Sequence, residues 1–234
     1  MADRKSGTSA TQNVYEQLRA DVLSSRLAPG QRLKIAALSA EHDVSPGAVR
    51  EALSRLTSEG LVIAEPQRGF RVAPISAFEL KDLTTVRVEI ESLCLRRSIE
   101  HGDADWEARL KEVFRRLSET PERVPEDSPL LDPKWAKLHH EYHETLVSAC
   151  DSPWLLRLRE MLYAQSERYR RLSWRLSDFN RDLNSEHRQI LDAALSRNAE
   201  LAVSLLSSHL LVTTQILLDN KVVDSEPENL AAAE

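Results

Sequence analysis

The segment 44–62, "VSPGAVREALSRLTSEGLV", decides the first part of the fold. Ser45 is a favourable N-cap residue, and Pro46 suits the first helical position because that position needs no N–H donor. An apolar stripe then follows at helical spacing, formed by Val49, Ala52, Leu53 and Leu56. Gly60 supplies the stop. The segment therefore predicts a helix with one buried side and an exposed first turn.

The flanking sequence completes a small domain. A helix is predicted around the apolar residues Val14, Leu18, Val22 and Leu23, and a short second helix runs from Ile35 to about Glu41. After Gly60, "LVIA" and "FRVA" are β-prone runs on either side of the turn "EPQRG", which predicts a hairpin. Three helices followed by a hairpin are typical of a winged helix-turn-helix.

This pattern explains the polar first turn of the helix from Pro46 to Ser58. The N-terminal end of a helix has unpaired N–H groups and a positive dipole, which suit phosphates and base edges in the major groove of DNA. Arg50 can bond a guanine or a phosphate, and Arg68 and Arg71 on the wing can reach the DNA backbone. The sequence thus predicts binding to double-stranded DNA.

The net charge of −6 argues against a nucleic-acid binder, but the charge is unevenly distributed. Residues 1–75 hold 10 basic and 8 acidic residues, giving +2, and the rest holds 21 and 29, giving −8. Because there is neither an apolar run near 18 residues nor a secretory signal, we expect no membrane association. Two distant cysteines, Cys94 and Cys150, indicate a reducing cytoplasm.

From residue 76 to about 221 the apolar periodicity is helical throughout, and the breaks divide it into six or seven helices. The expected fold is therefore mainly α, with a winged helix-turn-helix followed by an all-α helical bundle. The expected divisions are a disordered tail at 1–11, the DNA-binding domain at 12–75, the helical effector domain at 76–221 and a flexible tail at 222–234.

Four histidines of the second domain occupy apolar helical faces. His139 and His143 are four residues apart on one face, and His187 and His209 belong to the last two helices. Such imidazoles form a plausible ligand set for a divalent metal, although buried histidines are more often satisfied by carbonyls or neighbouring side chains. Catalysis has little support: "HEYHE" at 140–144 has the wrong spacing for a zinc protease, and a phosphate loop and a nucleophile elbow are both missing.

Taken in order, several motifs resemble the GntR-family bacterial transcription regulators. The motifs are "VREALSRLTSEGLV", "RGFRV", "RVEIE", "YHETLVSA", "EHRQIL" and "HLL", spread over about residues 12–220. The closest similarity is to the subfamily of the fatty-acid-responsive regulator FadR, whose C-terminal half is the FCD domain. The resemblance implies a homodimer that binds a short palindromic operator. It also implies a repressor of a carboxylic-acid catabolic operon, released by a small acid bound beside a metal.

The resemblance also implies a metal site and an effector residue. The family ligands are an Asp, a His four residues later, and two further His, so His139 stands where the family has Asp, followed by His143, His187 and His209. Four imidazoles favour Zn²⁺ or Ni²⁺ over Mn²⁺ or Mg²⁺. Arg87 occupies the position that meets the effector carboxylate, the alternative being a surface pair with Glu91.

A second departure from the family pattern, besides His139, concerns the DNA contacts. The family usually has Ser-Arg-Thr-Pro at 45–48, where this chain has Ser-Pro-Gly-Ala. The expected DNA contacts are therefore Ser45, Gly47, Arg50, Arg68 and Gly69, with an altered operator. A second cationic group, residues 168–171, favours a two-carboxylate effector and a resemblance to regulators of glutarate or hydroxy-acid catabolism. No one member of this group is assigned to the cavity.

Two alternatives remain open at this stage. In one, the protein is a metal-responsive regulator and the ion itself is the signal. In the other, it is a helical metalloenzyme with an accessory DNA-binding domain, which the missing carboxylate base weighs against. The expectation is a cytoplasmic regulator without enzyme activity.

Overall fold

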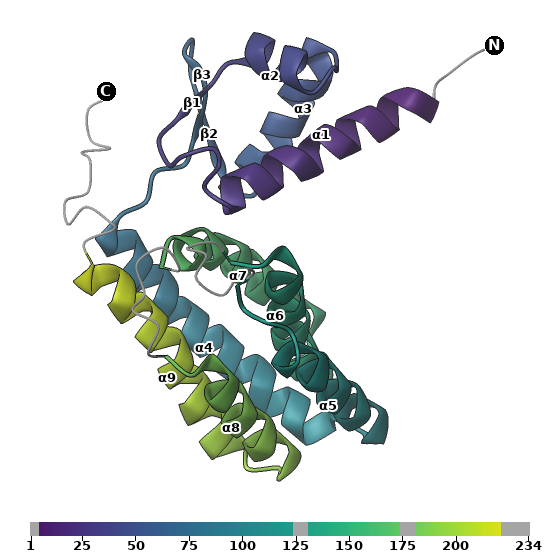
Figure 1. Ribbon diagram of the computed structural model, residues 1–234, viewed down its shortest axis with the longest axis vertical. Coiled ribbons are helices and arrows are strands. Elements are labelled where there is room, and N and C mark those ends of the chain that lie inside the picture. The colour runs from purple at the N-terminus through teal and green to yellow at the C-terminus, as the bar shows by residue number, and fades with distance from the viewer. Residues whose placement is uncertain (1–4, 124–130, 174–180, 221–234) are drawn as a thin grey trace. The chain divides into compact units, whose positions relative to one another are not determined.

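A computed structural model describes residues 5–123, 131–173 and 181–220. The chain divides into two compact units, Met1–Ser76 and Ala77–Glu234, which we call the N-terminal unit and the helical unit (Figure 1). Each unit has its own hydrophobic core. Each can therefore be described by itself.

The elements of the N-terminal unit are α1 (Lys5–Leu23), β1 (Arg32–Leu33), α2 (Ile35–Glu41), α3 (Pro46–Ser58), β2 (Val62–Glu65) and β3 (Gly69–Val72). Strand β3 lies between β1 and β2 and is antiparallel to both, with Val62 opposite Val72. The predicted winged helix-turn-helix is confirmed. Strand β1 was not predicted, because two residues are too few to show an alternating pattern.

Helix α3 is built as its sequence predicts. The Ser45 hydroxyl accepts a hydrogen bond from the backbone N–H of Ala48 at 3.2 Å, and Pro46 occupies the first turn. The apolar stripe is fully buried, with Val49, Ala52, Leu53 and Leu56 each 0% exposed. The buried stripe fixes the rotation of α3, so its first turn is left exposed to solvent.

The N-terminus differs from expectation. Helix α1 begins at Lys5, within the segment 1–11 that the sequence predicts to be a disordered tail. Once the amphipathic part around Val14 has nucleated, each residue added at the N-terminal end costs little, because it completes a backbone hydrogen bond. The expected flexible tail at 222–234 lies outside the described residues.

The helical unit contains α4 (Ala77–His101), α5 (Ala104–Ser118), α6 (Pro133–Leu146), α7 (Pro153–Ser173), α8 (Leu183–Leu195) and α9 (Ala199–Asp219). Helix α4 packs against α7 and α9, α5 against α6, and α8 against α9, as the ribbon shows (Figure 1). The predicted all-α bundle is confirmed. Its core includes the fully buried residues Leu95, Trp106, Tyr142, Leu146 and Ile190.

Helix α9 is the one described helix that is long and apolar enough to cross a membrane by length and composition alone. Its buried residues include Leu206, Leu210 and Leu217, and it packs against α4 and α8. A core helix of a bundle has the same composition.

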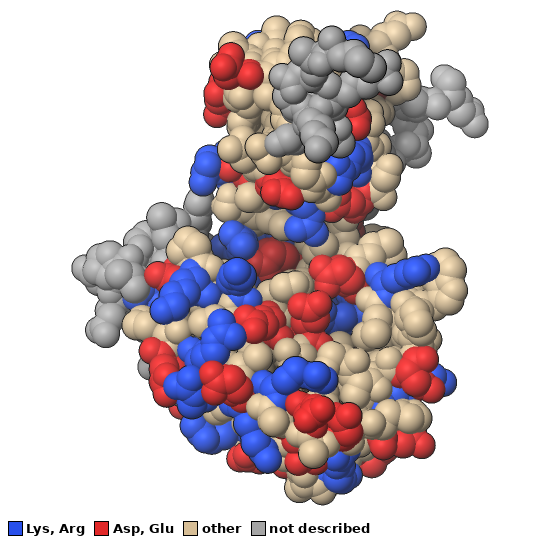
Figure 2. Space-filling view, turned by 90° about the vertical axis from the view of Figure 1, so that its right-hand side faces the viewer, with Lys and Arg blue, Asp and Glu red and all other residues tan. Residues whose placement is uncertain are grey.

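The outer surface of α5 is strongly charged. Arg115 pairs with Glu112 at 2.8 Å and with Glu119 at 2.6 Å, and Arg116 pairs with Glu141 at 2.9 Å. Figure 2 shows basic and acidic side chains interspersed over one face of the helical unit. Mixed charge of this kind indicates a solvated surface rather than a patch of one sign.

The turn between α4 and α5 provides a test of the packing. A Cβ atom added at Gly102 would lie 2.3 Å from Cε3 of Trp106 and 2.8 Å from the Ser98 carbonyl oxygen. Since Trp106 is fully buried, it has no room to move aside. Gly102→Ala should lower the free energy of unfolding by about 1–3 kcal/mol in urea denaturation followed by circular dichroism.

Gly47→Ala is the matched control, because a Cβ there meets only the Ser45 hydroxyl, at 3.8 Å. It should leave stability unchanged or raise it by up to about 1 kcal/mol through helix propensity. Equal stability of the two variants would contradict the packing described for Trp106.

Candidate metal and effector site, and the DNA-binding surface

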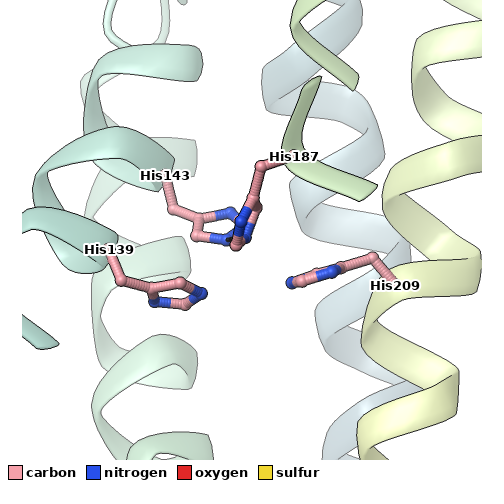
Figure 3. A group of neighbouring side chains, drawn as sticks. All are labelled: His139, His143, His187 and His209. Carbon is pink, nitrogen blue, oxygen red and sulfur yellow. Dashed lines mark hydrogen bonds between the residues drawn. The ribbon is translucent and has the colours of Figure 1, made fainter. Parts of the chain in front are cut away.

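Three helices bring four histidines to one point of the helical unit. His139 and His143 come from α6, His187 from α8 and His209 from α9 (Figure 3). None is more than 6% exposed. One ring nitrogen of each lies within 4.8 Å of the corresponding nitrogens of the others. The structure thus brings together all four residues that the sequence singles out as metal ligands.

The spacing of the rings fits a small cation. The Nε2 atoms of His143 and His187 are 3.3 Å apart. Two nitrogens bound to a tetrahedral zinc ion at 2.0–2.1 Å are separated by about 3.3–3.4 Å. The Nδ1 atom of His143 is buried and has no hydrogen-bond partner among the described residues. The Nε2 spacing therefore fits a metal ion, and the hydrogen bonds around His143 are not all satisfied.

The electrostatics keep these imidazoles neutral, which is the form that binds metals. Burial lowers the pKa of His139, His143 and His187 well below the usual value, and nearby histidines and arginines lower it further. Burial also lowers the pKa of His209, although a hydrogen bond with Glu186 partly opposes the shift.

A carboxylate outside the cluster orients one of the rings. Glu186 Oε2 lies 2.8 Å from Nδ1 of His209, so that ring donates outward and keeps Nε2 as the acceptor. Arg181 binds both oxygens of Glu186, at 2.7 and 2.8 Å, and also donates to the His209 carbonyl at 2.8 Å. Although burial raises it, the pKa of Glu186 is lowered to about 2 by the hydrogen bonds from His209 and Arg181. Such a carboxylate–histidine pair is a common support of metal ligands.

A cavity of about 30 Å³ adjoins three of the four histidines. It lies between α4, α6, α7 and α9, and its lining includes His139, His143, His209, Arg87, Ser166 and Arg170. The cluster and two guanidinium groups therefore face the same space. A small anion can contact both.

Arg87 pairs with Glu91 and lines the cavity, and its contact with an effector carboxylate stays a prediction. Its Nε and Nη2 donate to Glu91 Oε1 at 3.2 and 3.1 Å, and its Nη1 donates to the Ser166 hydroxyl at 2.7 Å. The pair with Glu91 is not on the surface, since Arg87 is 8% and Glu91 1% exposed. Arg159 donates to the other Glu91 oxygen at 3.2 Å. Arg87 is thus held rigidly at the cavity wall.

The cationic group at 168–171 divides between different environments. Arg170 lines the cavity and, like Arg171, donates to Glu167 at 2.7 Å. Arg168 is buried beside Gln165 and does not line the cavity, and neither does Arg171. The structure therefore places one arginine of this group at the site.

Arginines and glutamates beside the cavity form ion pairs. The buried or nearly buried groups around Tyr163 are Arg87, Arg159, Arg170, Glu91 and Glu167. Although burial raises the pKa of both Glu91 and Glu167, their arginine partners lower it, so both are carboxylates. Arg159 also pairs with Glu160 at 3.4 Å, so each of the three arginines has a carboxylate partner. An anion that binds beside Arg87 and Arg170 therefore meets guanidinium groups that are already held in place by carboxylates.

The residues predicted to contact DNA are exposed in the N-terminal unit. Ser45 and Gly47 lie at the start of α3, Arg50 follows one turn later, and Arg68 and Gly69 lie at the end of the β2–β3 hairpin. Gly69 has a φ of +89°, which favours glycine at this turn. The first three residues therefore belong to the helix that serves as the recognition helix in this fold, and the last two belong to its wing.

Several residues of the site were missed from sequence. Glu186 directly precedes His187 but supports His209 instead, and Arg181 and Arg159 lie on segments without a motif. The sequence shows Glu186 and His187 as neighbours. It does not show that Glu186 bonds to His209, because that contact depends on how α8 packs against α9.

The family follows from sequence similarity to known proteins. Residues 10–72 match "Bacterial regulatory proteins, gntR family", and residues 82–211 match the FCD domain. The chain belongs to the GntR family of transcription regulators. It combines the family's DNA-binding domain with an FCD domain, so it is a DNA-binding transcriptional regulator and not an enzyme.

Individual relatives agree with this assignment. The regulator is 42% identical over 196 residues to the "uncharacterized HTH-type transcriptional regulator BphR" of Paraburkholderia xenovorans, covering 84% of this chain and 80% of that protein. It is 30% identical over 207 residues to the "HTH-type transcriptional repressor GlaR" of Escherichia coli, covering 87% and 93%. The solved structure "E. coli McbR/YncC" has the same fold, with a TM-score of 0.74 at 20% identity, over 94% of this chain and 99% of that chain.

The histidine cluster leads to a prediction about metal content. The metal-free regulator should take up one Zn²⁺ per chain, and His143→Ala should weaken that affinity by more than the roughly 10–100-fold typical of substitutions outside the ligand shell. His140→Ala is the matched control, because His140 is the neighbouring residue on α6 and is outside the cluster. Mass spectrometry measures the Zn²⁺ content, and competition with a chromophoric chelator measures the Zn²⁺ affinity. Equal losses in the two variants would contradict the assignment.

The exposed start of α3 leads to a second prediction. Arg50→Ala should weaken binding to an operator selected from random duplexes by about 1–3 kcal/mol, because it removes a base or phosphate contact. Lys137→Ala removes the same charge from an exposed position on α6 and should leave affinity unchanged. Gel-shift titration at fixed salt measures the operator affinity of both variants. An unchanged affinity of Arg50→Ala would show that α3 is not the recognition helix.

Proposed function

We propose that this regulator is a cytoplasmic repressor of a carboxylic-acid catabolic operon, released when a small organic acid binds beside a metal in the helical unit. The main support is the cavity between α4, α6, α7 and α9, whose lining includes three histidines of the cluster together with Arg87 and Arg170. One of the relatives, GlaR, is named a repressor.

The residues around the cavity suit a carboxylate. Arg87 is fixed by Glu91 and Ser166, and its guanidinium can still present N–H groups to a planar anion. Arg170 also lines the cavity, so an anion there can contact two guanidinium groups. We infer that the carboxylate binds at this end of the cavity.

The proposed metal is Zn²⁺ or Ni²⁺, held by His139, His143, His187 and His209. Neutral nitrogen donors suit these ions better than Mn²⁺ or Mg²⁺. A bound ion adds positive charge, which strengthens the binding of an acid. Four imidazoles also complete a tetrahedral zinc shell, so the alternative in which the metal itself is the signal keeps specific support.

The connection between the units is short enough to transmit a change. The Ala73 N–H donates to the Leu61 carbonyl at 3.0 Å and so belongs to the N-terminal unit, whereas α4 begins at Ala77. Leu80 and Thr84, in the first two turns of α4, line the cavity. An acid that shifts α4 therefore acts close to the linker. A coupling of about 1–3 kcal/mol changes operator affinity roughly 5–150-fold.

We further propose that the regulator is a homodimer that binds a palindromic operator. Exposed apolar residues form a stripe on each of two helices. The stripe on α4 consists of Val86 and Leu93, and the stripe on α7 consists of Trp154, Leu158 and Met161. The ion pair between Arg97 and Asp151, at 2.7 Å, indicates that the two stripes adjoin. Trp and Met are enriched in protein interfaces. We call this surface the α4/α7 face.

The acid hypothesis predicts release of the operator. In the presence of Zn²⁺, a short mono- or dicarboxylate should raise the melting temperature and lower operator affinity about 5–150-fold. Arg87→Lys keeps the charge but loses the forked donor, so it should weaken the response to the acid while operator affinity without acid is retained. Arg116→Lys, at an exposed ion pair, is the matched control.

The same titration separates the alternatives. If Zn²⁺ alone changes operator affinity and acids add nothing, the metal is the signal. If only long-chain acyl compounds stabilise the protein, the short-acid hypothesis is wrong.

The interface hypothesis predicts the effect of one charge on each apolar surface. Leu158→Glu on the α4/α7 face should convert the dimer into a monomer, because a carboxylate in an apolar interface loses its hydration. Leu211→Glu is the matched control, since Leu211 is 51% exposed on a different helix, α9. Sedimentation velocity measures the mass, and a monomer formed only by Leu211→Glu would move the interface to α9.

A further inference from the structure

Tyr163 on α7 contacts one of the four histidines from outside the cluster. Its hydroxyl oxygen lies 3.5 Å from Nδ1 of His139. Both side chains are buried, since Tyr163 is 5% and His139 3% exposed. The contact joins α7 to α6, so it connects the cluster with a helix that supplies none of its four members.

The ring of His139 is also held by a second aromatic residue. Trp135, one turn earlier on α6, stacks on it with the ring centroids 4.8 Å apart and the planes inclined by 24°. Stacking fixes the plane of an imidazole, but a rotation of 180° about the bond between Cβ and the ring leaves the stacked faces in place. This flip exchanges each nitrogen with a ring carbon. A polar partner is therefore needed to select one of the two orientations.

Tyr163 selects the orientation that suits a metal ion. With Nδ1 of His139 turned toward the Tyr163 hydroxyl, the other ring nitrogen, Nε2, lies on the side that faces His209 (Figure 3). An imidazole that binds a metal through Nε2 carries its proton on Nδ1, and a tyrosine oxygen can accept a hydrogen bond from it. Glu186 has the same relation to Nδ1 of His209, at 2.8 Å.

The ring of Tyr163 is confined on several sides. The Cζ atoms of Arg87 and Arg159 lie 5.0 and 4.9 Å from its centroid, and the ring centroid of His140 lies 4.7 Å away. Both guanidinium groups pair with Glu91, at 3.1 and 3.2 Å, so they are themselves held in place. Contacts between cations and an aromatic ring are favourable when they are shielded from water. The hydroxyl is therefore kept in one position.

We propose that Tyr163 is a positioning residue of the metal site, whose hydroxyl accepts a hydrogen bond from Nδ1 of His139 and keeps Nε2 of that ring directed at the metal. The inference rests on the proposed function, since it assumes that the four histidines bind Zn²⁺. It adds a residue from a fourth helix to the site. The fourth nitrogen ligand then depends on a hydroxyl that does not itself touch the ion.

Removal of one oxygen atom tests the proposal. Tyr163→Phe keeps the ring and its packing and removes the hydroxyl. Competition with a chromophoric chelator should show a Zn²⁺ affinity of the full chain that is roughly 10–100-fold lower, the usual effect of losing a group that supports a metal ligand. Tyr169→Phe is the matched control, because Tyr169 is on the same helix, is 1% exposed and donates to Glu79, outside the cluster, at 2.7 Å. Its Zn²⁺ affinity should be unchanged.

The visible spectrum of the Co²⁺-loaded chain gives a readout that a purely structural role of Tyr163 would not move. Four-coordinate Co²⁺ absorbs much more strongly than Co²⁺ with five or six ligands, so the spectrum reports the coordination geometry. The parent chain and Tyr169→Phe should give the strong band. Tyr163→Phe should give a weaker band, because water replaces the ring of His139 in part of the molecules.

A double-mutant cycle assigns the effect to His139. In the His139→Ala chain the hydroxyl has no imidazole to orient, so the addition of Tyr163→Phe should change the Zn²⁺ affinity by less than about twofold. A larger further loss would show that Tyr163 acts through another group, and it would overturn the inference.

The outcomes separate this inference from the proposed function. If the parent chain takes up no Zn²⁺, the metal site and the role of Tyr163 are both wrong. If the parent chain binds Zn²⁺ but Tyr163→Phe loses no more affinity than Tyr169→Phe, or keeps the strong Co²⁺ band, the inference is wrong and the metal site stands.

Discussion

The structure of the helical unit depends on the burial of four neutral imidazoles at one point. His139, His143, His187 and His209 come from three helices, and a buried polar group without a partner is costly. A cation shared among the four ring nitrogens would remove that cost. It would also tie α6, α8 and α9 together beside the cavity.

The surroundings are arranged around this cluster in two directions. On one side, Arg181 holds Glu186, and Glu186 accepts a hydrogen bond from Nδ1 of His209. The Nε2 atom of that ring is thereby kept as the nitrogen that can bind a metal. On the other side, Glu91 lies between Arg87 and Arg159, so a guanidinium is held firmly at the cavity. Both are charged groups kept in place by a partner of opposite sign, which makes the site rigid before a ligand arrives.

Much of the fold was predictable because its signals are local. The cap at Ser45, the stripe on α3 and the hairpin around 66–69 are properties of short segments, and all were read correctly. The convergence of the histidines was predicted from the family resemblance, whereas helical periodicity alone gives only their faces.

The remaining features depend on contacts between distant segments. The bond of Thr84 to Thr214 and that of Glu186 to His209 join different helices, and no local pattern shows them. The extension of α1 to Lys5 was missed because its first residues are weak helix formers.

X-ray absorption at the zinc edge of the Zn²⁺-loaded full chain tests the central claim most directly. The account predicts four nitrogen neighbours at about 2.0–2.1 Å, with the outer-shell scattering of imidazole rings. Sulfur neighbours, or a shell made mainly of water and carboxylate oxygen, would contradict it.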